Sequence, residues 1–292
     1  MKVNIIVTGC DGQLGSSLKS ELINEKKFKY YFFNKKELNI TDQKNLEIVI
    51  NKVKPSVFIN CSAFTNVNLS ETNISDCLKV NVLGPKFISK LCKLNKCTLI
   101  HFSTDYVFDG NKKIPYLEND LTKPLSVYGK SKLCAENEII NSGCNYIIFR
   151  LSWLYNPKFN KNLISKLIHN IKKCKRFDSI ADEISKPTCS LTFARYIDKI
   201  IKNFKIKNVK FLLHYAENGR GISIFELANF INKSEKFKVF NTKINPVFSK
   251  KYHKMQIRPN YSVLDNGRLN KKFKINLDSW RNILNFNIKE FY

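Results

Sequence analysis

Two polar side chains one helical turn apart, Tyr128 and Lys132, could perform proton transfer. Residues four apart lie on the same face of a helix. A phenol with its ordinary pKa of about 10 exchanges protons poorly at neutral pH. A nearby ammonium group stabilises the phenolate and lowers that pKa, so we expect Lys132 to activate Tyr128. A second match to this spacing, Tyr31 and Lys35, crosses the end of a predicted strand, where the side chains would not share a face.

A hydroxyl group at the end of a predicted buried strand could assist this chemistry. Thr104 follows an apolar run that ends at Phe102. The carboxyl ends of parallel strands form the ligand-binding edge of open α/β folds. A Ser or Thr at a strand end is often only a turn former. The presence of Tyr128 and Lys132 favours a catalytic role over this structural one: Thr104 would donate a hydrogen bond to a substrate carbonyl.

Three glycines near the N-terminus predict a site for a pyrophosphate. The strand Lys2–Thr8 leads into Gly9, Gly12 and Gly15, where the helix Gly12–Glu25 opens. Glycines allow a tight turn and close approach of the backbone, and a helix N-terminus presents free N–H groups and partial positive charge. A glycine motif alone is weak evidence. Followed by a proton donor and a carbonyl-polarising group, it indicates a nucleotide-dependent reductase.

Length and composition fit a globular α/β protein. The chain has 292 residues, of which 43% are hydrophobic, and lacks an apolar run long enough to span a bilayer or a signal-peptide pattern. We therefore expect a cytoplasmic protein without a membrane partner. The nine cysteines contain no C-x-x-C pair, and the four histidines lack metal-ligand spacing. Reduced thiols and no metal site are the expectation.

The formal charge of +26 raises the question of a nucleic-acid partner. Proteins that bind nucleic acids favour Arg and cluster it on one element. Here the positive residues are mostly Lys, and both Lys and Arg are scattered along the chain. This pattern indicates a compositional bias, and we expect no nucleic-acid partner. The positive field would still attract anionic substrates such as a nucleotide-sugar.

The first half of the chain alternates short apolar runs with helix-period segments, which predicts a Rossmann-type doubly wound parallel sheet. Residues 1–152 form the expected nucleotide domain, residues of about 187–216 return to it, and 153–292 mainly form a smaller substrate-binding lobe. The further predicted strands are Lys29–Phe33, Val57–Cys61, Thr98–Ser103, Asn145–Leu151 and, later, Lys210–Tyr215. The further predicted helices are Asp42–Lys52, Ser75–Asn95, Tyr128–Asn141, Asn162–Lys173, Leu191–Asn203, Ser223–Lys233 and Leu277–Leu284, with 241–272 irregular.

These motifs resemble the extended short-chain dehydrogenase/reductase superfamily and, within it, the dTDP-4-dehydrorhamnose reductase family. The resemblance covers nearly the whole chain. Its most discriminating segments are Ser103–Gly110 (STDYVFDG) and Arg258–Ser262 (RPNYS). Further matching segments are Gly9–Gly15, Glu37–Asp42, Asn60–Thr65, Tyr128–Lys132, Arg150–Trp153 and Pro187–Thr188.

The resemblance implies NADPH-dependent reduction of the C4 ketone of dTDP-4-dehydro-6-deoxy-L-mannose to dTDP-L-rhamnose, in nucleotide-sugar and surface-polysaccharide biosynthesis. It also assigns the binding residues. The pyrophosphate would be held by Gly12, Gln13 and Leu14, and the adenine would lie against Asn39 and Ile40. The path to the nicotinamide would be lined by Ala63, Phe64 and Thr65. The sugar nucleotide would be bound by Thr104, Asp105, Tyr106 and Trp153. Tyr128 and Lys132 would contact the cofactor and transfer the proton. A divalent ion such as Mg²⁺, and a monomeric or homodimeric state, stay open.

The chain departs from the family pattern at two places that affect ligands. Asn34 stands where an acidic residue often binds the cofactor ribose, and Lys35 and Lys36 follow it. This exchange favours a 2′-phosphate, so we expect NADPH, with NADH as the alternative if the lysines reflect only composition. The segments Val67–Glu71 and Asp182–Thr188 also differ from the usual pattern. They leave open another nucleotide-linked 4-keto-6-deoxy sugar as substrate.

Two rival functions share this fold. Nucleotide-sugar dehydratases typically follow the threonine with an Asp-Glu pair, whereas here Thr104 and Asp105 are followed by Tyr106, which argues for a simple reductase. The regulatory β subunit of methionine adenosyltransferase binds NADP without catalysis. Intact Thr104, Tyr128 and Lys132 favour an enzyme over such a subunit.

Overall fold

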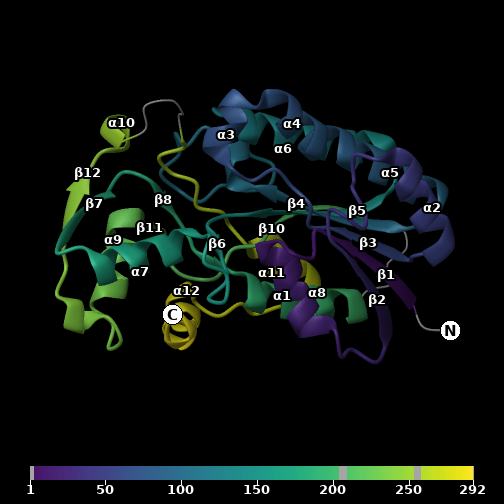
Figure 1. Ribbon diagram of the computed structural model, residues 1–292. Helices are drawn as coiled ribbons and strands as arrows, with labels where there is room; N and C mark the ends of the chain where they lie inside the picture. Colours follow the sequence, from purple (N-terminus) through teal and green to yellow (C-terminus); the bar gives the residue numbers. More distant parts are fainter. Residues whose placement is uncertain (1–2, 204–208, 253–257, 292) are drawn as a thin grey trace.

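A six-stranded parallel sheet runs through the larger part of the molecule (Figure 1). The structure, a computed structural model, describes residues 3–203, 209–252 and 258–291, so Lys2 and His253 lie outside the described residues. The strand order is β10-β5-β4-β3-β1-β2, which places a topological switch between β1 and β3. The strands are β1 (Val3–Thr8), β2 (Phe28–Phe33), β3 (Val57–Asn60), β4 (Thr98–Thr104), β5 (Asn145–Leu151) and β10 (Lys210–His214).

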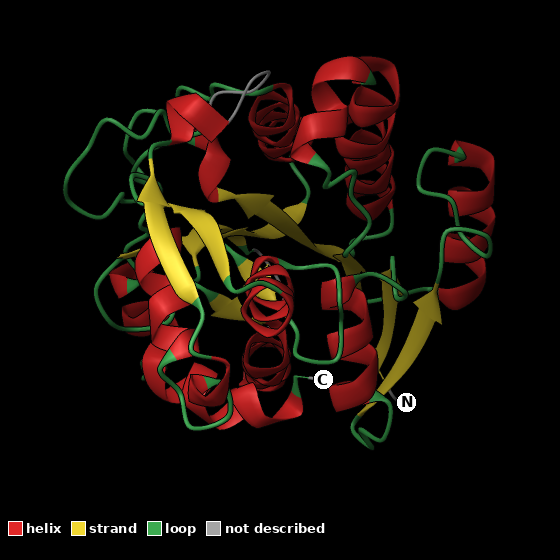
Figure 2. Cartoon of the chain, turned by 60° about the vertical axis from the view of Figure 1, so that its left-hand side comes forward, coloured by secondary structure: helices red, strands yellow, loops and turns green. Residues whose placement is uncertain are grey.

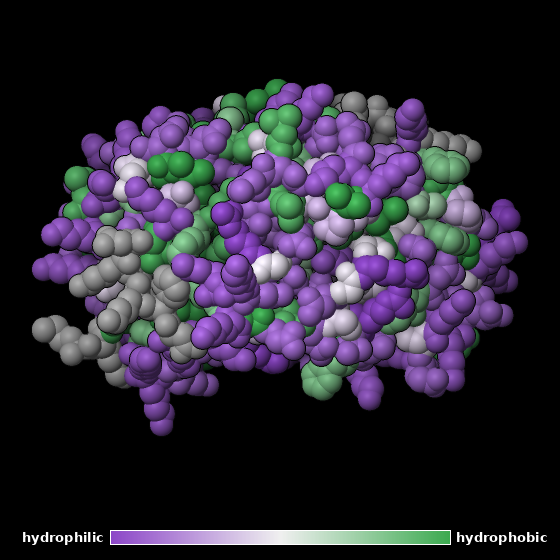
Figure 3. Space-filling model, turned by 180° about the vertical axis from the view of Figure 1, so that it is seen from behind, coloured by the Kyte–Doolittle hydropathy of each residue, from purple (hydrophilic) through white to green (hydrophobic). Residues whose placement is uncertain are grey.

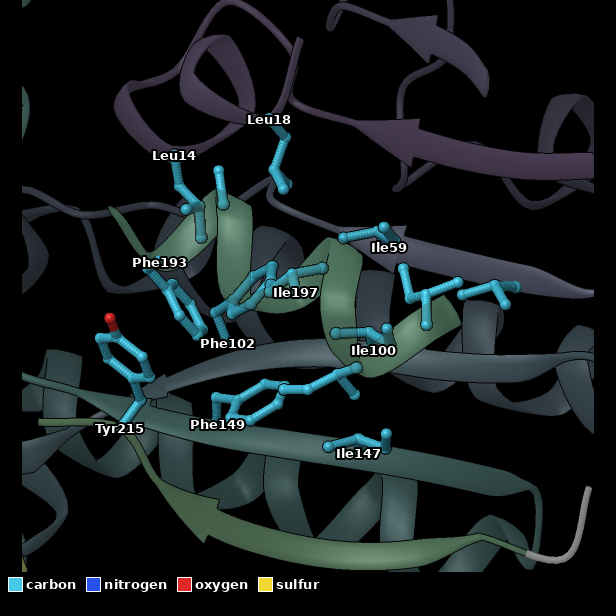
Figure 4. Close-up of a cluster of buried hydrophobic side chains, with 14 of the residues drawn as sticks. Leu14, Leu18, Ile59, Ile100, Phe102, Ile147, Phe149, Phe193, Ile197 and Tyr215 are labelled. Carbon is cyan, nitrogen blue, oxygen red and sulfur yellow. The ribbon is translucent and has the colours of Figure 1, made fainter. Parts of the chain in front are cut away.

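Helices cover both faces of this sheet, which confirms the predicted doubly wound fold. One face carries α1 (Gln13–Leu22), α8 (Ser190–Asn203) and α11 (Gly267–Phe273), and the other carries α2 (Gln43–Val53), α5 (Gly84–Leu94) and α6 (Val127–Ser142) (Figure 1). The central strands β3 and β4 are buried on both faces, because their side chains point alternately toward the two helical layers. On the first face, Phe193 of α8 packs edge-to-face on Phe102 and Phe149 of the sheet (Figure 4).

A smaller lobe lies beyond the carboxyl ends of the strands, and Figure 2 brings it forward. Trp280, Leu227 and Phe237 are fully buried in its separate hydrophobic core. Its elements are β7 (Arg176–Ile180), β8 (Ile184–Ser185), β11 (Ile222–Ser223), β12 (Lys243–Val247), α7 (Leu163–Lys173), α9 (Ile224–Asn232), α10 (Ser249–Tyr252) and α12 (Trp280–Asn287). The short strands β6 (Leu154–Tyr155) and β9 (Thr188–Cys189) pair where the lobe joins the sheet.

The prediction of one continuous α-helix over Ser75–Asn95 is wrong in the middle of that range. Helix α3 (Val67–Thr72) precedes α4 (Ile74–Leu78), and a π-helical segment, Lys79–Leu83, joins α4 to α5. The physical reason is Pro85, which has no N–H to donate to the carbonyl of the preceding turn and whose ring crowds that turn. π-Helical turns often occur at functional sites. This one holds a loop that lines the cleft described below.

The prediction that 241–272 is irregular is also wrong, because β12, α10 and α11 lie there. Strand β12 contains Pro246, which cannot donate to a ladder, and such strands are confined to sheet edges. Among the described residues it pairs only with β7, in a two-stranded sheet. The last helix begins later than predicted, at Trp280, because the Ser279 side chain accepts a hydrogen bond from the backbone of Asn282 and caps it there.

The surface is largely hydrophilic, and apolar residues form scattered groups on the face shown in Figure 3. The cysteines are free thiols, most of them buried. Within the described ranges no three His, Cys, Asp or Glu side chains gather as metal ligands. No helix in the same ranges is both long and apolar enough to cross a membrane.

Candidate active site

A cleft of about 540 Å³ opens at the carboxyl edge of the sheet, next to the β1–β3 switch. Ligands bind at this position in open α/β folds. The segments that follow β1, β3, β4 and β5 all contribute to it. The structure brings together in its lining the predicted residues Gly12, Gln13, Leu14, Ala63, Thr65, Thr104, Asp105, Tyr106, Tyr128, Lys132 and Trp153.

The glycine loop has the shape that a pyrophosphate site requires. Gly9 has a φ of +68°, and a Cβ atom there would lie 2.7 Å from the backbone nitrogen of Ser62. A Cβ atom on Gly15 would lie 2.1 Å from the carbonyl oxygen of Gly9. Helix α1 begins after Gly12 without a capping side chain or an acid in its first turn. Its N-terminal N–H groups are therefore available to an anion, and the residues present fit a dinucleotide.

We expect Gly15→Ala to lower the free energy of unfolding by about 1–3 kcal/mol, since the new methyl group forces the loop backbone apart. Gly12→Ala is the matched control, because the nearest atom to its Cβ lies 3.3 Å away and its φ of −76° suits alanine. Urea denaturation of the cofactor-free proteins measures both. Equal losses in the two variants would contradict the steric explanation.

Several predicted cofactor residues lie outside the cleft lining. Asn34 accepts hydrogen bonds from the backbone of Lys36 and Glu37, which forms a turn that leaves the Lys35 and Lys36 side chains exposed. Asn39 likewise binds its own turn, at Thr41. Gly9 and Gly15 also lie outside the lining. Ile40 is buried against Gly84 of α5, and Phe64 makes hydrogen bonds through its backbone.

The π-helical segment holds the loop after β3 in place. Asn81, buried in this segment, accepts a hydrogen bond from the backbone N–H of Phe64 at 2.8 Å and donates to its carbonyl at 3.0 Å. The same amide donates to Ser131 of α6 at 3.0 Å. The backbone between the cleft residues Ala63 and Thr65 is thereby fixed to the helix that carries Tyr128.

Tyr128 and Thr104 both line the cleft. Thr104 accepts from the backbone N–H of Tyr106 at 3.2 Å and donates to Asp105 Oδ1 at 3.1 Å. Burial raises the pKa of Tyr128 above its ordinary value. Desolvation is the largest effect on this pKa, and the activation of Tyr128 by Lys132 stays a prediction.

Lys132 is buried and points toward the sheet. Its Nζ lies 3.4 Å from His101 Nε2. Burial lowers the pKa of Lys132 to about 8, while the carboxylate of Glu136 acts in the opposite direction. Asn60 donates to His101 Nδ1 at 3.3 Å and accepts from Thr8 and from the backbone N–H of Ser62. The lysine therefore ends a polar chain that spans β1, β3 and β4.

Asp105 is buried, and both of its carboxylate oxygens are occupied. Oδ1 accepts from Thr104, and Oδ2 accepts from Ser262 at 2.5 Å and from Ser185 at 3.3 Å. Burial raises the pKa of Asp105 to about 6, and the three hydroxyl donors act in the opposite direction. Ser185 belongs to β8, and Ser262 lies in the RPNYS segment, so this carboxylate joins the edge of the sheet to the smaller lobe.

Two aromatic residues flank the catalytic edge. The ring of Tyr106 packs edge-to-face on that of Tyr128, with centroids 6.0 Å apart. Trp153 follows β5 with a φ of +37°, a conformation that is strained for a bulky side chain and that persists mainly at functional sites. Its half-buried side chain both packs on the core of the smaller lobe and lines the cleft.

A buried ion pair supports the floor of the cleft. Arg150 of β5 donates to both oxygens of Glu136 on α6, at 2.9 and 2.7 Å. Ser103, adjacent to Thr104, donates to the same carboxylate at 2.5 Å. Glu136 lies one helical turn beyond Lys132, so this network fixes the strand ends against the helix that carries both tyrosine and lysine.

Sequence reasoning missed other residues that line the cleft. Cys61 and Phe102 are near the ends of β3 and β4, and the strand predictions could have indicated them. Phe159 and Lys161 come from the connection between β6 and α7. They carry no local signal, because the folding of that connection over the cleft depends on the smaller lobe.

A dinucleotide-shaped glycine loop, a parallel sheet and a Tyr-Lys pair beside a strand-end threonine define an NAD(P)-dependent oxidoreductase of the extended short-chain dehydrogenase/reductase class. A comparison with family models is consistent with this, since the model described as RmlD substrate binding domain matches residues 1–292. The chain belongs to this family, that of the dTDP-4-dehydrorhamnose reductases.

Individual relatives and structures agree. The chain is 29% identical over 284 residues to a dTDP-4-dehydrorhamnose reductase of Aggregatibacter actinomycetemcomitans, covering 96% of each chain. It is 28% identical over 265 residues to a dTDP-4-keto-6-deoxy-D-glucose reductase of Streptomyces niveus, covering 89% of this chain and 87% of the relative. It is similar to the structure of dTDP-4-dehydrorhamnose reductase from Bacillus anthracis in complex with NADP, with a TM-score of 0.91, 29% identity and coverage of 99% and 100%.

Proposed function

We propose that this protein catalyses the NADPH-dependent reduction of the C4 ketone of dTDP-4-dehydro-β-L-rhamnose to dTDP-L-rhamnose. The observation that carries the proposal is that Thr104, Tyr128 and Lys132 line one cleft at the sheet edge, next to an uncapped helix N-terminus. The names of the relatives support the substrate. The free cysteines support a reducing compartment, the cytoplasm.

In this reaction the residues of the cleft would have distinct roles in cofactor binding and in proton transfer. The N–H groups at the start of α1 bind the pyrophosphate, and Ala63 and Thr65 line the path to the nicotinamide. The reduced nicotinamide supplies a hydride when the cofactor is bound. Tyr128 delivers a proton to the oxygen of the ketone, and the Thr104 hydroxyl stabilises the charge that develops there.

Lys132 and the residues at the mouth of the cleft would bind and orient the ligands. The buried Lys132 is suited to hold the nicotinamide ribose, and Trp153 with Tyr106 would form an apolar wall against the sugar nucleotide. Asp105 lies behind Thr104 and would act on the sugar through it. The exposed Lys161 provides a positive charge at the mouth, where the diphosphate of the substrate would enter.

We expect the double variant Lys35→Ala/Lys36→Ala to weaken NADPH binding roughly 10-fold and to leave NADH binding unchanged, since a charge-assisted contact to the 2′-phosphate is lost. Both ammonium groups are exposed and lack an ion-pair partner among the described residues. Lys26→Ala/Lys27→Ala is the matched control, because this exposed pair precedes β2 at the other edge of the sheet. Titration of each cofactor by fluorescence measures the effect, and equal weakening of NADH binding would contradict the assignment.

NADPH consumption with dTDP-4-dehydro-β-L-rhamnose tests the proposed function. Turnover with this sugar in preference to dTDP-4-keto-6-deoxy-D-glucose supports it, whereas the opposite preference would assign the chain to the activity named for the Streptomyces niveus relative. Tight NADPH binding without turnover of either sugar would refute the reductase and indicate a regulatory NADP-binding subunit.

A further inference from the structure

Four polar groups form a hydrogen-bonded row that ends at the cleft. They are the backbone N–H of Ser62, the side-chain amide of Asn60, the ring of His101 and Nζ of Lys132. The distances between successive members are 3.1, 3.3 and 3.4 Å. Because the side chains of Asn60, His101 and Lys132 are buried, they depend on one another for their hydrogen bonds.

The direction of the hydrogen bonds along this row follows from its first member. A backbone N–H can only donate, so Asn60 turns its amide oxygen toward Ser62 and its NH₂ group toward His101. Thr8 donates to the same oxygen at 3.0 Å, which supports this orientation. Nδ1 of His101 must therefore accept, and a neutral imidazole that accepts at Nδ1 carries its proton on Nε2. That N–H group faces Nζ of Lys132.

A charged Lys132 does not fit the end of this row. An ammonium group can only donate, so two donors would face each other across the 3.4 Å between Nε2 and Nζ. A flipped Asn60 amide only moves the conflict, because its NH₂ group would then face the N–H of Ser62. A neutral amine has a lone pair that accepts from Nε2–H, and every group of the row is then matched.

We propose that His101, oriented by Asn60, is a positioning residue that favours the neutral amine of Lys132 over its ammonium form. The kinetic consequence rests on the reductase function proposed above, in which Lys132 activates Tyr128 as an ammonium group. Reduction is then lost as the pH rises and Lys132 gives up its proton. His101 thereby sets the upper end of the pH range in which the protein reduces its ketone.

The other titratable groups around Lys132 act on its charge independently of the row. Burial lowers the pKa of Lys132, and Glu136 on the same helix and Cys77 of α4 act in the opposite direction. Arg150 already binds the Glu136 carboxylate, and burial raises the pKa of the Cys77 thiol, which is therefore neutral at pH 7. The neighbouring acids Asp105 and Glu71 act on the pKa of Tyr128 and of Cys77, respectively. A substitution within the row leaves these groups in place.

The first test is ¹⁵N NMR of the cofactor-free protein labelled at histidine, and it needs no sugar. At about pH 9, Lys132 is mostly neutral and can donate or accept, so Asn60 alone selects the tautomer of His101. The signals of His101 are assigned by their loss in His101→Gln. We expect the proton on Nε2 in the wild type. In Asn60→Asp a second carboxylate oxygen replaces the NH₂ group, so the proton is expected on Nδ1. A proton on Nδ1 in the wild type would overturn the proposal.

The second test is the pH profile of kcat/KM for the NADPH-dependent reaction. In Asn60→Asp, Nε2 of His101 becomes an acceptor and a charged Lys132 fits the row. The alkaline limb is therefore expected to move up by about one to two pH units. A double variant, Asn60→Asp with His101→Phe, separates this effect from the added charge, because the ring that transmits the change is absent. Relative to His101→Phe alone, it is expected to shift the limb by less.

Two kinetic results contradict the proposal: a limb at the same pH in wild type and Asn60→Asp, or an equal shift in the presence and absence of the His101 ring. His169→Gln is the control for loss of a histidine, since this exposed residue of α7 lies outside the row, and it leaves the limb unchanged. Absence of turnover by the wild type refutes the proposed function instead. ¹³C NMR of the Cε atom of Lys132 then follows the same shift without substrate.

Discussion

Tyr128→Phe is expected to lower kcat by about 10²–10⁴-fold, the usual contribution of a positioned proton donor. The variant keeps the ring, so the edge-to-face contact with Tyr106 and the wall of the cleft are retained. It loses the hydroxyl that is proposed to deliver the proton. NADPH binding is therefore expected to weaken by no more than about 10-fold, because a single neutral hydrogen bond contributes only about 0.5–1.5 kcal/mol. The measurement is NADPH consumption with dTDP-4-dehydro-β-L-rhamnose, together with a fluorescence titration of NADPH.

The matched control for this variant is Tyr31→Phe. Tyr31 is the other tyrosine with a lysine four residues later, and it lies on β2, away from the cleft lining. Its loss is expected to leave kcat unchanged. A Tyr128→Phe enzyme that retains half of the wild-type kcat would show that another group supplies the proton.

Arg150→Met is expected to destabilise the fold by about 3–5 kcal/mol at neutral pH. The side chains of Arg150 and Glu136 are only 3% and 2% exposed, and their hydrogen bonds are bidentate. Removing the guanidinium leaves a buried carboxylate without its counter-ion, and that uncompensated charge is the cause of the loss. Chemical denaturation at pH 7 measures the loss.

Two controls separate this charge effect from a simple packing defect. Arg150→Met combined with Glu136→Met replaces the pair by apolar groups and is expected to recover most of the lost stability. Arg195→Met breaks a pair with Glu21 whose arginine side chain is 60% exposed, and it is expected to cost less than about 1 kcal/mol. A double variant as unstable as Arg150→Met alone would rule out the charge explanation.

The sheet was predictable from the sequence because its strands are apolar on both faces. Asn145–Leu151 is predicted with the bounds that the structure has, since this run is nearly continuous in hydrophobic residues and ends at polar or turn-forming ones. The cleft could be located for a related reason: parallel strands place the residues after their carboxyl ends at one edge. Thr104 and the glycine loop thus meet, although about 90 residues separate them.

The partners that tune the site could not be predicted in this way. Ser185 and Ser262 are 80 and 157 residues from Asp105, and no local pattern relates them to it. The direction of the pKa shift of Tyr128 was also out of reach, because the spacing to Lys132 gives proximity along a helix but not the burial that dominates the shift. Asn81 binds the Phe64 backbone from a π-helical segment, whereas the sequence pattern alone shows an uninterrupted amphipathic run.

The attachment of Asp105 to the smaller lobe constrains how this protein can evolve. Ser185 and Ser262 both bind this carboxylate, and their segments bind each other, as Ile184 accepts from the backbone of Ser262 and donates to Asn260. Recombination that exchanged the smaller lobe as a cassette would replace two of the three hydroxyl donors of a group at the catalytic edge. New sugar specificities are therefore expected to arise by substitution within the lobe, with these two serines retained, rather than by lobe shuffling between paralogues.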